Sequence, residues 1–396
     1  AVGATSTLSG LIIGFLLGLS NGFAIITAQK FGAKNIADMK KSFAMSLVIG
    51  TGISILFTIA GLLFLKPILH FLNVPKHLVP VAKGYIAIII AGLLATFLYD
   101  ACAATLRAIG DAVTPLIILA ISVALNIMGD LFFVVVLKTG VKGAAIATVL
   151  AQIIAFVICW IYMIRKYEIL RLQKEEFKDP SPIMVKEMIS AGMSMGFMSS
   201  LINIGTLTLQ TAINKLGKDI IIAHTAARKI TEIFMIMFSV FGQTMATYCG
   251  QNYGAGKYDR IRQGLKAVLG IGCVFSVIIF ILSHTISPYL ISFIASSKNE
   301  EVIYWGTQYL VYDMSFQVVC VFIVILRNSL QGIGDQRTPV FSSFIELAGK
   351  VVFTLVFVRR FGYWAVIWTE PVIWICMVIP LIVTAAGNPV LFGKQK

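Results

Sequence analysis

Several long stretches of this sequence contain no Asp, Glu, Lys or Arg, and they decide the class of fold. They include residues 1–29, 42–65, 143–164, 188–214, 233–256 and 371–393. A helix of roughly 20 apolar residues crosses the hydrocarbon core of a bilayer, and inside lipid every backbone polar group must be bonded within the protein. A transmembrane barrel would instead show short segments of alternating polarity. The sequence therefore predicts an all-α polytopic membrane protein.

We expect eleven spanning helices along the 396 residues. They are expected at about 5–29, 42–65, 80–106, 115–138, 143–164, 185–215, 223–250, 264–290, 303–331, 339–358 and 362–386. The long hydrophilic stretch at 165–184 carries mixed charges and contains Pro-Ser-Pro, which is typical of a linker. The expected domains are an N-terminal helical bundle at 1–164, a cytoplasmic linker at 165–184 and a C-terminal helical bundle at 185–396.

The sequence contains an internal repeat. The segment LRAIGDAVTP at 106–115 returns as LQGIGDQRTP at 330–339, with six of the ten positions identical. Tyr85 and Tyr309 match at the same spacing as these two segments, so the repeat extends beyond them. Two halves of six helices would insert in the same orientation, as parallel repeats do. The second half begins with a helix, 185–215, that has no counterpart in the first half, so we expect the first helix of a twelve-helix protein to be absent from this chain.

Each copy of the repeated segment is expected to form a tight corner between two helices. Gly110 and Gly334 suit the left-handed residue that ends a helix. The Thr-Pro pairs that follow, at 114–115 and 338–339, suit the start of the next helix, with Thr as the N-cap and Pro at the first helical position.

The chain is basic, with 32 Lys and Arg, 18 Asp and Glu, and a formal net charge of +14. The basic residues lie in short loops between apolar runs, which is typical of the charge that orients membrane helices rather than of nucleic-acid binding. The loops on the side of the linker carry the larger share. We therefore expect a multi-pass protein of the plasma (inner) membrane, with the linker and the C-terminus in the cytoplasm.

The sequence does not indicate an enzyme. The six cysteines lie in apolar runs without a CxxC pair, and the four histidines are scattered, so neither set suggests a metal site. Tyr99-Asp100 and GIGD at 332–335 imitate the motifs of intramembrane aspartyl proteases, but Asp335 falls at a loop corner. GAGK at 254–257 lacks the spacing of a P-loop. We expect a non-enzyme without a cofactor, so that any pumping draws on an ion gradient.

Eight ionisable residues lie within the predicted helices, where a charge is costly and usually functional. They are Asp100, Asp130, Glu232, Asp313, Arg327, Glu346, Lys350 and Glu370. When the halves are aligned so that 106–115 matches 330–339, Asp130 aligns with Thr354 and Glu370 aligns with Ile146. The charges are therefore expected to serve each half separately and not the shared scaffold.

Four of these residues, in three places, suggest specific chemistry. Asn126 and Asp130 are four apart on one helix face, and a carboxylate with an amide carbonyl suits a hard monovalent cation or a proton; a polar tie between two helices is the alternative. Glu346 and Lys350 are also four apart, which favours an ion pair, either functional or purely structural. Glu370 precedes a proline, where both a functional bend and ordinary helix packing remain open.

Several motifs together resemble the multidrug and toxic compound extrusion (MATE) family of transporters. They are GQNYGAGKYDRI at 250–261, LRAIGDAVTP at 106–115, ALNIMGDLFFV at 124–134, VKGAAIATVLAQ at 141–152, RNSLQGIGDQRTP at 327–339 and TEPVIW at 369–374. The resemblance covers nearly the whole chain. It implies two six-helix bundles around a central cavity that opens alternately to either side. It also implies export of amphipathic, often cationic, compounds in exchange for Na⁺ or H⁺.

The resemblance carries site residues with it. In one branch of the family, a cation site in the N-terminal bundle uses an Asp on helix 1, an Asn and an Asp four apart on helix 5, and a Thr on helix 6. The last three match Asn126, Asp130 and Thr148, so Na⁺ at Asp130 is implied, while the helix-1 Asp would lie in the absent helix. The family's Glu-x-x-x-Arg on helix 11 appears as Glu346 and Lys350, which keeps the charge but loses the guanidinium fork.

These observations predict a secondary active exporter that works by alternating access. Coupling or gating is assigned to Glu346, Lys350, Glu370 and Arg327, and the substrate cavity to Asp100, Asp313 and Glu232. The expected partners are a drug-like small molecule and the lipid bilayer, with the chain acting as a monomer and without nucleic acid. The main alternative is a flippase for lipid-linked oligosaccharide or peptidoglycan precursors. That function predicts a basic cavity, whereas the predicted helices hold more acids than bases, which favours cationic cargo.

Overall fold

The structure is a computed structural model that describes residues 2–71 and 79–392. Regular secondary structure within these residues is entirely helical. Nine of the described helices are long and apolar enough to cross a membrane, and two bent helix pairs bring the number of spans to eleven. The prediction of an all-α polytopic membrane protein is confirmed, and the expected eleven spans agree with the upper count among the described residues.

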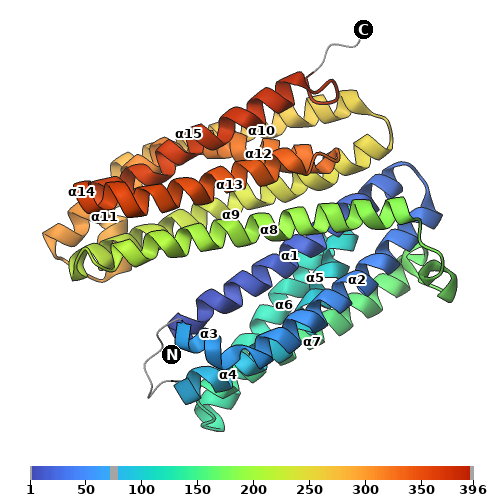
Figure 1. Ribbon diagram of the computed structural model, residues 1–396, viewed down its shortest axis with the longest axis horizontal. Coiled ribbons are helices and arrows are strands. Elements are labelled where there is room, and N and C mark those ends of the chain that lie inside the picture. The colour runs from blue at the N-terminus through green and yellow to red at the C-terminus, as the bar shows by residue number, and fades with distance from the viewer. Residues whose placement is uncertain (1, 72–78, 393–396) are drawn as a thin grey trace. The chain divides into compact units, whose positions relative to one another are not determined.

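Two compact units divide the chain, Ala1–Ser200 and Leu201–Lys396. The first unit contains α1 (Val2–Gly32), α2 (Ile36–Leu63), α3 (Leu65–Phe71), α4 (Val79–Ala91), α5 (Leu93–Ala108), α6 (Val113–Asp130), the π-helical segment η1 (Leu131–Val136), α7 (Val141–Lys166), η2 (Glu168–Leu170) and η3 (Lys174–Phe177) (Figure 1). Helix α5 packs against α1, α2 and α7, and α6 pairs with α7. Large apolar side chains on α6, such as Leu116, Ile117 and Met128, are more than half exposed, as expected of a surface that faces lipid.

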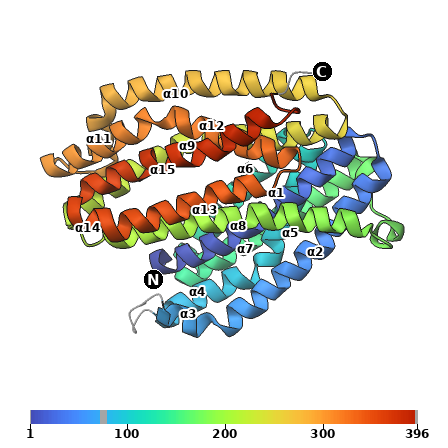
Figure 2. The same cartoon turned by 45° about the horizontal axis from the view of Figure 1, so that its top comes forward.

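Helix α8 (Pro182–Ile213) begins in the first unit and ends in the second. The second unit continues with α9 (Lys218–Gly254), α10 (Tyr258–Ala295), α11 (Glu300–Ser315), α12 (Gln317–Gly332), α13 (Arg337–Val352), the π-helical segment η4 (Phe353–Phe357), α14 (Val358–Phe361) and α15 (Tyr363–Gly387) (Figure 2). Helix α12 packs against α9, α10 and α15, and α13 lies along α15. The boundary between the units falls inside α8, so the assignment of all of 185–396 to a C-terminal bundle stays a prediction.

The repeat is visible in the backbone of both units. The span formed by α4 and α5 bends by 41° and the span formed by α11 and α12 bends by 50°. The breaks lie at Gly92 and Phe316, which match each other at the spacing of the repeated segment. Gly140 and Gly362, which precede α7 and α15, are also equivalent, and both have positive φ (63° and 57°). The number of residues between these two glycines is smaller than the number between the two repeated segments. The spacing of the repeat therefore shortens by two residues before the last helix of each unit.

This change in spacing corrects one sequence alignment. A constant spacing matched Glu370 with Ile146, but at the shorter spacing that relates α7 to α15, Glu370 falls on Thr148. The physical reason is that the loop before α15 is shorter, and loops tolerate length changes that helices in lipid do not. Both residues at this equivalent position are polar.

The two corners keep the predicted turn but use a different cap. Gly110 and Gly334 have φ of 101° and 99°, so the prediction of left-handed glycines at the helix ends is confirmed. The prediction that threonine forms the N-cap is wrong. The N–H of Thr114 donates to Oδ1 of Asp111 at 3.0 Å, and the second corner repeats this bond at 3.2 Å between Thr338 and Asp335. The N-cap residues are Ala112 and Gln336, and the short side chain of the aspartate before each of them accepts a hydrogen bond from a free N–H of the first helical turn.

Asp111 also ties its corner to the predicted linker. Oδ2 of Asp111 accepts hydrogen bonds from the hydroxyls of Tyr167 and Thr114, both at 2.7 Å, and Nζ of Lys166 lies 3.7 Å away. Burial favours the neutral carboxyl, but these hydrogen bonds and the ammonium outweigh it and lower the pKa of Asp111 below its usual value. A carboxylate at this corner therefore fixes the start of residues 165–184 against the end of α5.

A close helix contact in the first unit gives a stability prediction. A Cβ added at Gly50 of α2 would lie 1.8 Å from Cζ of Phe97 on α5, and the ring of Phe97 is fully buried. We expect Gly50→Val to lower the free energy of unfolding by about 1–3 kcal/mol, because the packed ring has no space to move into. Melting followed by a thiol-reactive dye, which reports exposure of the buried cysteines, measures the change. Gly52→Val is the matched control, since nothing lies within 4 Å of a Cβ at that exposed position; equal melting temperatures would contradict the prediction.

Candidate functional site

The first candidate site lies between α6 and α7 of the first unit. Nδ2 of Asn126 donates to Oγ1 of Thr148 at 3.2 Å, and Oγ1 of Thr148 donates to the carbonyl oxygen of Ala144 at 3.0 Å. Both helices approach closely here, because a Cβ at Gly129 would lie 2.9 Å from the Cβ of Ala147. The structure thus brings together two of the three residues predicted to bind a cation.

Asp130, the third predicted ligand, is the last residue of α6. Its Oδ1 atom is buried and has no hydrogen-bond partner among the residues that the structure describes. A buried carboxylate oxygen without a partner is costly and usually has a functional explanation, such as an ion that completes its coordination. The π-helical segment η1 begins directly after Asp130, and such wide turns are frequent at functional sites.

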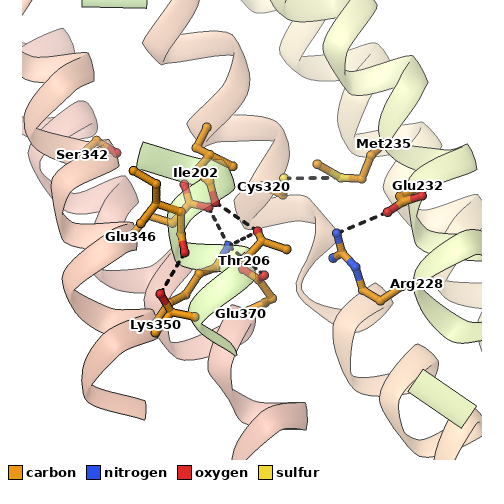
Figure 3. A network of polar contacts seen from close by, with 12 residues as sticks. Ile202, Thr206, Arg228, Glu232, Met235, Cys320, Ser342, Glu346, Lys350 and Glu370 are labelled. Carbon is orange, nitrogen blue, oxygen red and sulfur yellow. Dashed lines mark hydrogen bonds and ion pairs between the residues drawn. The ribbon is translucent and has the colours of Figure 1, made fainter. Parts of the chain in front are cut away.

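The second candidate site is a buried network of charged residues in the second unit (Figure 3). Nζ of Lys350 donates to Oε1 of Glu346 at 2.8 Å, to Oγ1 of Thr206 at 3.4 Å, and lies 3.1 Å from Oε1 of Glu370. Nη2 of Arg327 lies 3.9 Å from Oε2 of Glu346. The network joins residues of α8, α12, α13 and α15, and its four charged members were the residues assigned to coupling or gating.

Burial makes the charge balance of this network important. Lys350, Arg327, Glu346 and Glu370 are each no more than 6% exposed. Two cations and two carboxylates are therefore removed from water together and neutralise one another. Arg327 also donates from Nη2 to Oγ of Ser342 at 3.3 Å, although its Nε has no partner among the described residues. Glu370 lies directly before Pro371, and α15 runs through that proline as one continuous helix.

The three residues predicted to line a substrate cavity lie in different surroundings. Asp313 is 1% exposed, and its Oδ2 accepts hydrogen bonds from Thr231 at 3.4 Å and Gln317 at 3.2 Å. Glu232 is exposed and lies 3.8 Å from Arg228. Asp100 is on α5 of the first unit, whereas the other two acids belong to the second unit. A shared cavity for these three residues stays a prediction.

Several polar residues of the second unit carried no signal in the sequence. Thr206 is one of several hydroxyl residues in a long apolar helix, and Thr231 and Gln317 are uncharged polar residues near an acid. Uncharged polar residues inside spans usually bond their own backbone, so sequence alone does not select them. Arg228 has basic neighbours near the start of α9, and a charge near a helix end is normally topological.

The described part of the chain does not hold a group of three or more His, Cys, Asp or Glu side chains arranged for a metal ion. All six cysteines are free, and four of them are buried. Any ion bound at Asn126, Thr148 and Asp130 would therefore be held by carboxylate, amide and hydroxyl oxygens, which suit hard monovalent cations.

Comparison with known proteins identifies relatives along most of the chain. The family model MatE matches residues 1–132 and 194–356. The probable multidrug resistance protein YpnP of Bacillus subtilis (strain 168) is 30% identical over 314 residues, which cover 78% of this chain and 68% of that protein. The multidrug export protein MepA of Staphylococcus aureus (strain MW2) is 20% identical over 365 residues, with 90% and 79% covered.

Solved structures match the fold. A MOP superfamily transporter from Pyrococcus furiosus superposes with a TM-score of 0.87 at 19% identity, covering 98% of this chain and 88% of that chain. An outward-facing multidrug resistance MATE family transporter superposes with a TM-score of 0.85 at 20% identity, covering 96% and 84%. The predicted fold class is therefore confirmed.

Proposed function

The chain belongs to the MatE family of multi-pass membrane transporters and acts in multidrug efflux, and from this premise we propose that it exports amphipathic organic cations in exchange for Na⁺ or H⁺. The observation that carries the coupled exchange is the buried Oδ1 of Asp130, which has no partner among the described residues. It lies one helical turn beyond Asn126, whose amide already contacts Thr148. An ion or proton at Asp130 satisfies this oxygen.

In this proposal, ion binding and drug binding favour different arrangements of the helices. A ligand shifts such an equilibrium only through its differential affinity for the two states. The coupling ion favours the state in which Asn126, Asp130 and Thr148 converge, and the drug favours the other state. Arg327, Glu346, Lys350 and Glu370 form the coupling or gating network of the second unit, because a buried set of ion pairs with several members has few alternative arrangements.

We also propose a membrane, an oligomeric state and an orientation for the protein. The protein lies in the plasma (inner) membrane as a monomer, with the 165–184 linker and the C-terminus in the cytoplasm. Asp100, Asp313 and Glu232 contribute negative charge to the path of a cationic substrate, and catalysis is not part of the proposal. The excess of basic residues in the loops on the side of the linker supports this orientation.

The alternative function, flipping of a lipid-linked precursor, is not favoured. A pyrophosphate group would need cationic side chains that are free to bind it. In the second unit Lys350 contacts Glu346 and Glu370, and Arg327 contacts Glu346. Two of the basic residues inside the spans are therefore already neutralised by carboxylates.

Transport in proteoliposomes tests the proposed function. Vesicles holding the protein and a fluorescent lipophilic cation receive an inward or outward Na⁺ gradient, and a pH gradient in a separate experiment. We expect one of the two gradients to drive movement of the dye at a rate well above that of protein-free vesicles. Movement that is absent under both gradients would contradict cation antiport, and the same vesicles would then be assayed with a fluorescent lipid-linked oligosaccharide.

A further inference from the structure

Each unit contains one contact between equivalent helices, α6 with α7 and α13 with α15, but the side chains that make the contact differ. Asn126 on α6 and Lys350 on α13 match at the spacing of the repeated segment, which also relates these two helices. Thr148 on α7 and Glu370 on α15 match at the shorter spacing that relates the last helix of each unit. Asn126 contacts Thr148 at 3.2 Å, and Lys350 contacts Glu370 at 3.1 Å. An uncharged hydrogen bond in one unit is thus replaced by an ion pair in the other.

The backbone around the two contacts also corresponds. A π-helical segment follows α6 at η1 and follows α13 at η4. Asp130, directly before η1, and Thr354, within η4, match at the same spacing as Asn126 and Lys350. Each has a buried side-chain oxygen, Oδ1 of Asp130 and Oγ1 of Thr354, that lacks a hydrogen-bond partner among the described residues. The equivalence therefore extends one turn beyond the contact itself, and the two places are copies of one structural site.

The side chain of Lys350 is surrounded in the way that a bound cation would be. Its ammonium group has three N–H donors, and three oxygens lie within 3.4 Å: Oε1 of Glu346, Oε1 of Glu370 and Oγ1 of Thr206 (Figure 3). Lys350 itself is 2% exposed. Two carboxylates and a hydroxyl are the kind of oxygen ligands that hard monovalent cations take.

The ammonium is also part of the charge balance in this buried place. Glu346 has Arg327 as a second cationic neighbour, whereas Lys350 is the cation of this network that pairs with Glu370. A buried charge in this position is paired, neutralised by a proton or bound to an ion. In the first unit, the equivalent position holds the uncharged Asn126, and Asp130 supplies an unpaired carboxylate oxygen.

We infer that Lys350 is a built-in cation, which permanently fills the second unit's copy of an alkali-cation site formed by Glu346, Glu370 and Thr206. The site becomes exchangeable when the charge at position 350 is removed. One consequence rests on the proposed function: the first unit alone binds an exchangeable ion, so that one site couples transport. The inference that Glu346, Glu370 and Thr206 form a cation site in the second unit does not depend on that consequence.

Direct cation binding tests the inference. The variant Lys350→Asn gives the second unit the residue found at the equivalent position of the first. Full-length chains with and without this change, all carrying Asp130→Asn, are purified and compared for binding of radioactive Na⁺ and Rb⁺. The pH is mildly alkaline to limit competition by protons. We expect Lys350→Asn to bind one additional alkali cation per chain. Lys350→Arg, which keeps the charge, is expected to gain none, and Lys350→Asn combined with Glu370→Gln is expected to lose the gain.

A second measurement covers the case in which the variant is unstable. Anything that binds only the folded state raises the melting temperature, so the melting temperature of Lys350→Asn should rise with Na⁺ or Rb⁺ and not with N-methylglucamine. Lys350→Arg should melt at the same temperature in all three salts. A Lys350→Asn protein that binds neither ion, or that melts or fails to fold alike in all three salts, overturns the inference.

The two proposals fail in different ways. If the chain with Lys350 intact binds no exchangeable ion but Lys350→Asn gains one, the built-in cation is supported and coupling at Asp130 is not. If the intact chain binds an ion that Asp130→Asn abolishes, but Lys350→Asn gains none, the first-unit site is supported and the inference about Lys350 is wrong.

Discussion

Asp130→Asn is expected to abolish ion-driven efflux while leaving the fold intact. The substitution removes the negative charge but keeps the size and polarity of the side chain, so the ion loses its only carboxylate among Asn126, Asp130 and Thr148. Coupling between two bound ligands is typically worth a factor of about 5–150 in affinity, so the gradient-driven rate should fall by at least about fivefold. Stability should not fall with it, because Oδ1 of Asp130 makes no hydrogen bond to a described residue that the substitution would break.

The measurement is the rate of dye movement in proteoliposomes under the effective gradient, together with the melting temperature of the purified protein. Asp179→Asn is the matched control, since it makes the same chemical change at an exposed position of the 165–184 segment. The control should transport at the wild-type rate. Driven efflux that survives in Asp130→Asn would transfer the coupling to the Glu346 and Glu370 network, and a large loss of stability would mean that Asp130 has a structural partner.

Glu346→Gln is expected to destabilise the second unit more than any other single change in the buried network. Glu346 is the carboxylate that contacts both Lys350, at 2.8 Å, and Arg327, at 3.9 Å. Its neutralisation leaves two buried cations with the single carboxylate of Glu370. Breaking a buried ion pair by removing one partner costs about 3–5 kcal/mol, because the remaining charge is uncompensated.

Thermal melting in detergent, with chemical denaturation where it is reversible, measures this loss. Glu232→Gln is the matched control, because Glu232 is exposed in its pair with the partly buried Arg228, and pairs at the surface contribute about 0–1 kcal/mol. Adding Lys350→Met to Glu346→Gln removes the excess cation and should recover part of the lost stability, which a double-mutant cycle quantifies. If both glutamine variants melt at similar temperatures, the network is not the buried, neutralised set of charges described above.

The sequence determined the class of fold and the order of its parts. Uncharged runs of roughly 20 residues have to be helical in lipid, so a helical protein with many spans could be predicted from these runs. Gly110 and Gly334 could be predicted to be left-handed, because a local turn depends on a few neighbouring residues. The family motifs are likewise local strings, and four of the six lie within or overlap residues 1–132 and 194–356, which the family model matches.

Only the tertiary structure decided which polar residues meet. Thr206 and Lys350 lie far apart in the sequence, and Lys350 also reaches Glu370 on another helix. The periodicity of a helix tells which residues share its face, but it does not tell which residues of another helix that face contacts, because that depends on the packing of both backbones. The equivalence of Thr148 and Glu370 was hidden for a related reason, since a loop shortened by two residues shifts the spacing without changing the helices. The lysine that fills one unit's copy of the site was therefore readable in the sequence as a charge, but its role became visible only when α8, α13 and α15 were packed together.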